Sequence, residues 1–277
     1  MGSPNNLLVR LRSNIEPLSK KLRQVADYIL ENAQDVQFQT ITDLARNTQT
    51  SEATVVRLCR DLGYKGYSDF RMALAVDLSQ NAAKSKPSGD GDIVDVSANS
   101  AVDSLQDTSK LIDRKALNRI CSLVHQADFI GCVGVGASSI VGRYLAYRLI
   151  RIGKNAIMYE DTHLAAMNAS RSKEGDLWFS VSSSGSTREV VHAAKQAFNK
   201  GVPVVALTNI NHSPLSAISS EMLVAARPEG PLTGGAFASK VGALLLVDVL
   251  VNSLLDKYPE YTDSVMETAE VVVPLMS

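Results

Sequence analysis

The spacing of apolar residues changes near residue 97. Through residues 1–80 they recur every three or four positions, which predicts helices, and no run there has the composition of a strand. Residues 81–96, NAAKSKPSGDGDIVDV, are rich in Ser, Gly, Asp and Lys, a composition typical of a linker. We therefore expect two domains, 1–80 and 97–277, with a linker at 81–96.

Five short apolar runs in the second domain have the length and content of buried strands. They are 129–135, 155–160, 176–182, 202–208 and 222–226. Helical spacing lies between or after them, at 139–151, 162–170, 187–200 and 236–255. Alternation of continuous apolar strands with helices indicates a parallel sheet covered on both faces. We expect an all-helical N-terminal domain followed by an α/β/α sandwich with a five-stranded parallel sheet.

The segment 41–66, ITDLARNTQTSEATVVRLCRDLGYKG, predicts two short helices joined by a tight turn. Thr40 and Asp43 have the spacing of a capping box, with Asp in place of the usual Glu or Gln. Ser51 is placed to cap the second helix, and Gly63 suits the position after its end. Two capped helices in this arrangement form a helix-turn-helix, which would bind DNA.

The second helix of such a motif enters the major groove with its N-terminal residues at the base edges. The residues expected there are Ser51, Glu52, Thr54 and Arg57. An arginine at this position can grip a guanine through two hydrogen bonds. Four later side chains suit contacts with DNA phosphates instead: Arg60, Lys65, Tyr67 and Arg71.

Charge supports this interpretation only weakly. The whole chain has a formal net charge of −1, and residues 1–80 carry ten Lys and Arg against nine Asp and Glu. DNA binding would have to come from a local patch, because no global basic field exists. The alternative is an ordinary helical hairpin with solvated arginines.

The remaining composition points to a globular protein of the cytoplasm. The apolar run 241–251 is too short to span a bilayer and contains Asp248, and residues 1–12 lack the features of a signal peptide. The cysteines and histidines are scattered without metal-ligand spacing, so we expect free thiols, no metal and no cofactor.

Two polar loops each follow a predicted strand and precede a predicted helix. GVGASS, at 134–139, departs from a dinucleotide fingerprint because Ser139 stands where the last glycine is required. SSSGSTRE, at 182–189, offers hydroxyl and amide donors that suit a phosphate monoester. The alternative is that Ser186 simply caps the following helix. Two such loops at one edge of a sheet favour a ligand crevice.

These motifs in this order resemble the RpiR-type regulators. LSKKLRQVADYILEN, with the helix-turn-helix and the following YSDFRMAL, looks like their DNA-binding module over residues 7–80. GVGASS and SSSGSTRE look like the loops of their sugar isomerase (SIS) domain, over residues 110–255. The resemblance implies a homodimeric transcription regulator that binds operator DNA and a phosphorylated sugar. The apolar segments 7–30 and 236–255 are candidate interface elements.

The resemblance also implies roles for residues. The SxSGxT pattern would hold the phosphate on Ser182, Ser184, Gly185 and Thr187. The first loop would contact the sugar or the phosphate through Ser138 and Ser139. Two further candidates for sugar or phosphate contacts are His163 and Lys240. For these two, a hydrogen-bonded loop histidine and a solvated lysine are the alternatives.

Within the family, the chain is similar to repressors of sialic-acid catabolism, which implies N-acetylmannosamine 6-phosphate as the releasing effector. SIS domains also occur in sugar-phosphate isomerases, which need a general base and a general acid. The candidates for such catalysis are Glu189, His163 and Glu229. They form no recognisable dyad, and a helix-turn-helix has no purpose in an isomerase, so we favour a non-enzymatic regulator. A phosphosugar-binding adaptor that does not bind DNA is the third alternative.

Overall fold

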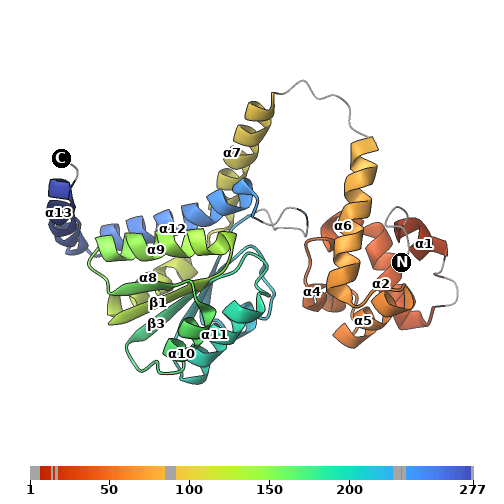
Figure 1. Ribbon diagram of the computed structural model, residues 1–277, viewed down its shortest axis with the longest axis horizontal. Coiled ribbons are helices and arrows are strands. Elements are labelled where there is room, and N and C mark those ends of the chain that lie inside the picture. Colours follow the sequence, from red (N-terminus) through yellow and green to blue (C-terminus); the bar gives the residue numbers. More distant parts are fainter. Residues whose placement is uncertain are drawn as a thin grey trace. The chain divides into compact units, whose positions relative to one another are not determined.

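A computed structural model describes residues 7–13, 15, 18–84, 92–226, 232 and 235–275 (Figure 1). The chain divides into two compact units, one of Met1–Val94 with Glu229–Gly234, the other of Asp95–Pro228 with Gly235–Ser277. The division after Val94 falls inside helix α7, Ile93–Leu111.

The N-terminal unit is helical throughout its described residues. Its helices are α1 Leu7–Ser13, α2 Lys20–Glu31, α3 Ala33–Val36, α4 Ile41–Asn47, α5 Glu52–Asp61 and α6 Tyr67–Lys84. The apolar face of α5, which includes Val55, Leu58 and Cys59, is buried in one apolar core with residues of α1 and α2. The apolar residues of segment 7–30 therefore pack in this core. Their apolar character is explained without a dimer interface.

The predicted caps of the helix-turn-helix are present. Thr40 and Asp43 form the capping box of α4, and the Ser51 hydroxyl accepts a hydrogen bond from the Thr54 N–H at the start of α5. Gly63 has a φ of 90°, as expected after a helix end. In the turn between the helices, Gln49 has a φ of 50°, a left-handed conformation that its sequence did not indicate.

The C-terminal unit contains the predicted parallel sheet. Its strands are β1 Phe129–Gly134, β2 Ala156–Tyr159, β3 Asp176–Val181, β4 Val204–Thr208 and β5 Glu221–Val224, in the order β2-β1-β3-β4-β5. One face packs against α8 Arg114–Gln126, α9 Ala137–Arg151 and α12 Phe237–Lys257. The other packs against α10 Thr162–Ala169 and α11 Arg188–Asn199 (Figure 1). Helix α13, Tyr261–Val272, follows α12.

Helix α12 is long and apolar enough to cross a membrane by length and composition alone. In this fold it lies in the core of the C-terminal unit, where Leu246, Val247, Leu250 and Leu254 are buried. Packing against the sheet therefore accounts for the apolar character that made the segment a candidate interface.

Helical residues enter the predicted linker from both sides. Helix α6 continues to Lys84, and α7 begins at Ile93. Residues 85–91, between them, lie outside the described part of the chain, so the linker boundaries 81–96 stay a prediction.

The three cysteines are buried and unpaired to one another. Burial raises the pKa of the Cys59 and Cys132 thiols to about 12, so both stay protonated at neutral pH. Among the described residues, no group of three His, Cys, Asp or Glu side chains is placed to hold a metal ion.

Candidate functional site

The strand order places a topological switch point, the position that serves as the ligand crevice of open parallel sheets, at the carboxyl ends of β1 and β3. These two strands are neighbours, yet the chain leaves β1 through α9 toward β2 and leaves β3 through α11 toward β4 on the opposite side. The connections diverge at this point, which is where ligands bind in open parallel sheets. Both loops selected from the sequence, 134–139 and 182–189, begin here, and α11 starts at Arg188 within the second.

The first loop turns tightly into α9. A Cβ on Gly134 would lie 3.1 Å from the carbonyl oxygens of Ser138 and Val181, so a side chain there would require the backbone to shift by a few tenths of an ångström. Gly136, the N-cap of α9, has a φ of 55° and supplies no side-chain cap. Ser138 is buried in the first turn, and the Ser139 hydroxyl donates to the Gly136 carbonyl at 2.8 Å. The start of a helix favours an anion, and here the N–H groups of Ser138 and Ser139 donate to the carbonyls of Val135 and Gly136.

The second loop joins Ser182 to the start of α11. The hydroxyls of Ser182 and Thr187 are hydrogen-bonded at 3.0 Å. Thr187, not Ser186, is the N-cap of α11, and its side chain makes no capping bond. Gly185 has a φ of 59° and lies against Ser213, so a Cβ at 185 would overlap the Ser213 hydroxyl. The loop is therefore more than a helix cap.

The start of α12 completes the crevice. Lys240 is buried in the first turn of α12 and donates from Nζ to the Ser183 hydroxyl. The neighbouring Ser239 hydroxyl is also buried and has no hydrogen-bond partner among the described residues. A Cβ on Gly235 would lie 3.3 Å from the Cβ of Ala137, so the segment before α12 also approaches the first loop.

These contacts place Lys240 beside the second loop, residues 182–187, which is the Ser-rich loop. They exclude the alternative that Lys240 is a solvated lysine. Ser183, the residue that joins Lys240 to the loop, was not among the residues predicted from the sequence. Its hydroxyl accepts from Lys240, and its carbonyl accepts from the Asn209 N–H at 3.1 Å. Nothing local distinguishes Ser183 from its neighbours, because its partners come from distant parts of the chain.

His163 lies in an adjacent groove rather than in the Ser-rich loop. Its side chain is exposed, and its N–H donates to the Asp161 carboxylate at 2.8 Å. The groove, of about 440 Å³, lies between α10 and α11 and is lined by Thr162, His163, Ala166, Met167, Arg188, Glu189 and His192. His163 and Glu189 thus share one groove, whereas Glu229 lies outside the described residues. Arg188, a cation beside Thr187, was not among the residues predicted from the sequence.

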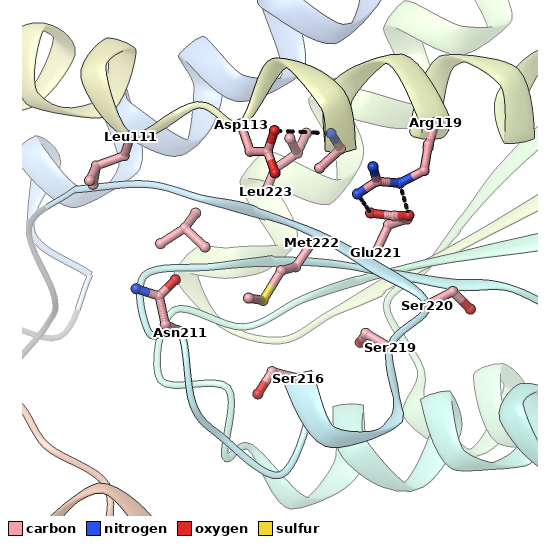
Figure 2. A pocket seen from close by; sticks show the side chains of 12 residues that line it. Leu111, Asp113, Arg119, Asn211, Ser216, Ser219, Ser220, Glu221, Met222 and Leu223 are labelled. Carbon is pink, nitrogen blue, oxygen red and sulfur yellow. Dashed lines mark hydrogen bonds and ion pairs between the residues drawn. The ribbon is translucent and has the colours of Figure 1, made fainter. Parts of the chain in front are cut away.

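A second hollow, of about 450 Å³, follows the edge strand β5 (Figure 2). Arg119 of α8 contributes a cation there, but its Nε and Nη2 both donate to the carboxylate of Glu221. An anion would have to compete with that carboxylate. None of the predicted effector residues lines this hollow, so the crevice at β1 and β3 is the better candidate for a phosphate.

The predicted DNA-contacting side chains lie on the accessible surface of the helix-turn-helix. Arg60, Lys65 and Arg57 are exposed, and the Arg57 side chain is 74% accessible, with Nε 4.0 Å from the Asp61 carboxylate. Polar residues at the start of α5 have structural partners as well. The Ser51 and Thr54 hydroxyls are 2.9 Å apart, and the Glu52 carboxylate accepts from Thr42 of α4 at 2.7 Å.

Tyr67 does not suit a phosphate contact, and that prediction was wrong. Its side chain is buried, and its hydroxyl donates to the carbonyl of Gln39 at 3.1 Å. Arg71 donates to the same carbonyl from Nη1, also at 3.1 Å. Both side chains therefore attach α6 to the turn before α4.

A basic hollow beside α5 was not predicted from the sequence. Its volume is about 460 Å³, and it is lined by Ser19, Lys20, Lys21, Leu22, Ala53, Thr54 and Arg57. Ser19 is the N-cap of α2 and makes no side-chain capping bond. A helix start with two lysines beside Arg57 is a suitable place for a DNA phosphate.

Gly185→Ala should destabilise the C-terminal unit more than Gly201→Ala. Both glycines have a positive φ, but a Cβ at 201 meets nothing within 4 Å, whereas one at 185 overlaps Ser213. The backbone strain of about 1 kcal/mol is common to both, and the overlap adds about 1–3 kcal/mol. Denaturant unfolding followed by the fluorescence of Trp178, which is buried in this unit, measures the difference. Equal losses of unfolding free energy in the two variants would show that Ser213 moves aside without an energetic penalty.

Comparison with known proteins agrees with the predictions for both halves of the chain. The helix-turn-helix domain of the rpiR family matches residues 5–81, and the SIS domain matches residues 123–253. An uncharacterized HTH-type transcriptional regulator of Bacillus subtilis, YbbH, is 31% identical over 97% of each chain.

Solved structures show the same relationship. The NanR protein of Vibrio vulnificus, complexed with ManNAc-6P, is 82% identical, with a TM-score of 0.92 over 98% of this chain and 100% of that one. A putative sugar-phosphate isomerase of Listeria monocytogenes is 14% identical, with a TM-score of 0.56 over 72% of this chain and 97% of that one, and shows the fold alone. The chain therefore belongs to the RpiR family of HTH-type transcriptional regulators, with a helix-turn-helix domain followed by a SIS domain.

Proposed function

We propose that this regulator represses a sialic-acid catabolic operon in the cytoplasm and that N-acetylmannosamine 6-phosphate releases it from the operator. The observation that carries the proposal is the 82% identity, over 98% of the chain, with a NanR protein solved in complex with ManNAc-6P. The crevice at β1 and β3 provides the chemistry that such a ligand requires.

The phosphate would lie at the Ser-rich loop. Ser182, Ser184 and Thr187 supply hydroxyls, the start of α11 supplies amides, and Gly185 allows close approach of the backbone. Lys240 brings a positive charge to the same loop through Ser183. A phosphate monoester carries a charge of about −1.5 to −2 at neutral pH, so a buried ammonium beside hydroxyl and amide donors favours it. The sugar would extend toward the flanking side chains of Ser138, Ser139 and His163.

The DNA would bind across α5. Arg57, whose side chain is 74% accessible, would reach a guanine edge, while Ser51, Glu52 and Thr54 lie at the N-terminal end of the helix. Arg60 and Lys65 would contact phosphates, and Lys20 and Lys21 extend the phosphate contacts to the start of α2. This local gathering of cations compensates for the weak net charge of the domain.

A sugar-phosphate isomerase is the second candidate function. The observation that favours it is the shared groove of His163 and Glu189, which brings a possible acid and base to one place. The helix-turn-helix and the naming of the similar proteins as transcriptional regulators favour the non-enzymatic function.

We further propose a homodimer, because two-fold symmetric operators are bound by two-fold symmetric proteins. The second copy would pack on α9 and α13. Ile140, Tyr147 and Ile150 form one stripe along α9 and are each at least half exposed. The adjacent hollow, of about 470 Å³, is lined by Tyr147, Ile150, Arg151, Glu267, Thr268, Val271 and Val272. An apolar surface of this kind is typical of an interface.

Arg57→Ala should weaken operator binding by about 1–3 kcal/mol and relax the base preference at one position. The matched control is Arg114→Ala, an exposed arginine at the start of α8. Lys20→Ala with Lys21→Ala should instead weaken binding to all sequences and lower the log–log salt slope by about 2. Electrophoretic mobility shifts over a salt series distinguish the two effects. Unchanged operator affinity in Arg57→Ala would refute its role.

Ser182→Ala with Thr187→Val should lower the affinity for N-acetylmannosamine 6-phosphate by at least about tenfold, since each removes a hydrogen bond to a charged group. Ser186→Ala, in the same loop but exposed, is the control and should bind normally. Titration calorimetry gives the affinities, and product analysis of the same mixtures tests catalysis. Normal binding by the double variant would refute the assignment of the phosphate site. Conversion of the ligand would establish the isomerase function instead.

Tyr147→Asp with Ile150→Asp should convert the dimer to a monomer, because two charges would be buried at the interface. Phe198→Asp, at a half-exposed phenylalanine on α11, is the control and should leave the dimer intact. Sedimentation velocity at several protein concentrations reports the state of each variant. Persistence of the dimer in the α9 variant would place the interface elsewhere.

A further inference from the structure

Helix α7 is attached to the C-terminal unit in an unusual way. Its buried side chains are two hydroxyl residues one helical turn apart, Ser104 and Thr108, which are both inaccessible to solvent. Its larger apolar side chains include Val96, Val102 and Leu111, and these are exposed. A helix normally docks through an apolar stripe. Here hydrogen bonds take a large part in fixing its position.

Each hydroxyl is bonded to the backbone of a different element. The Ser104 hydroxyl donates to the carbonyl of Ala238, in the first turn of α12. The Thr108 hydroxyl accepts from the N–H of Ala226, just after β5, at 3.0 Å. Gly242 makes room for both, because a Cβ there would lie 2.6 Å from the Thr108 hydroxyl and 3.0 Å from that of Ser104.

The Ser104 contact leads to the Ser-rich loop through α12. Ala238, which accepts the bond from Ser104, lies two residues before Lys240 in the same helical turn. Lys240 in turn donates to the Ser183 hydroxyl. A movement of the Lys240 backbone would therefore move the partner of Ser104.

The Thr108 contact leads to Ser183 by a second route. Ser183 accepts at its carbonyl from the Asn209 N–H, at 3.1 Å. The Asn209 side-chain amide donates to the carbonyl of Ala226 at 2.8 Å, and the N–H of Ala226 donates to Thr108. Two separate routes, each made of hydrogen bonds and short covalent segments, thus connect Ser183 to α7.

The position of α7 in the chain gives these contacts their significance. The division between the two units falls after Val94, within this helix, so α7 is one of the places where the C-terminal unit continues into the DNA-binding unit. A change in the position or stability of α7 is therefore a change in one of the covalent connections between the units.

We propose that Ser104 and Thr108 are positioning residues that couple the phosphate site to α7. The inference rests on the proposed function in placing a phosphate at the Ser-rich loop. A bound phosphate competes with the Ser183 hydroxyl for the Lys240 ammonium and shifts the first turn of α12. The shift alters the contacts of Ser104 and Thr108, and α7 responds. The ligand acts on the DNA-binding unit only as far as it binds the two arrangements of α7 unequally.

The first test needs no ligand. Hydrogen–deuterium exchange of the full chain should show that Ser183→Ala raises the exchange rate of amides in residues 105–111 by about tenfold, because their attachment is loosened. Ser186→Ala is the loop control, and helix α8 is the internal reference. Lys240→Met, which removes the buried ammonium itself, should act like Ser183→Ala and serves if that variant does not fold. Unchanged exchange in α7 with both variants would overturn the coupling.

The second test adds N-acetylmannosamine 6-phosphate, with binding measured by calorimetry. The ligand should change the exchange rate of residues 105–111 at least about threefold in the unmodified chain and less than about twofold in Ser104→Ala with Thr108→Val. Binding without any change in α7 of the unmodified chain would overturn the coupling and leave the proposed effector intact. Absence of binding would instead refute the effector, while the first test still decides whether Ser183 supports α7.

Discussion

The polar architecture of the C-terminal unit depends on the burial of Lys240 against Ser183. Removing an ammonium from water is costly unless donors and acceptors compensate for the lost hydration. Ser183 accepts from Lys240 with its hydroxyl and from Asn209 with its carbonyl, so one residue joins the Ser-rich loop, the start of α12 and the end of β4. Because such a network is strongest when every member is satisfied, these three segments are held in a defined arrangement around the crevice.

The crevice itself is a product of topology. The order β2-β1-β3-β4-β5 sends the connections from β1 and β3 to opposite sides, and the glycines at 134 and 185 let the two loops turn without steric conflict. The same scaffold is found in a putative sugar-phosphate isomerase at 14% identity. Function therefore depends on the side chains placed at the crevice and on the helix-turn-helix attached to the scaffold, rather than on the sheet.

Local patterns in the sequence predicted most of the fold. The strands are continuous apolar runs, and the capping box of Thr40 with Asp43 depends on residues three positions apart, so both can be read along the chain. Tyr67 was misinterpreted because an aromatic hydroxyl near a DNA-binding helix looks the same whether it faces solvent or the Gln39 carbonyl. Lys20, Lys21 and Ser183 were missed for a related reason. Folding brings these residues next to partners that are distant in the sequence, so no local spacing predicts their contacts.

Gly242 carries more information than a position on an apolar core helix usually does. Glycine is a poor helix former, and alanine would be preferred there by about 1 kcal/mol if packing did not forbid it. The hydroxyls of Ser104 and Thr108 lie where a methyl group at 242 would have to be. The three positions are therefore expected to vary together during evolution: relatives that keep the two hydroxyls retain the glycine, and relatives that lose them are free to replace it. A sequence alone would then record whether a given regulator still holds α7 against α12.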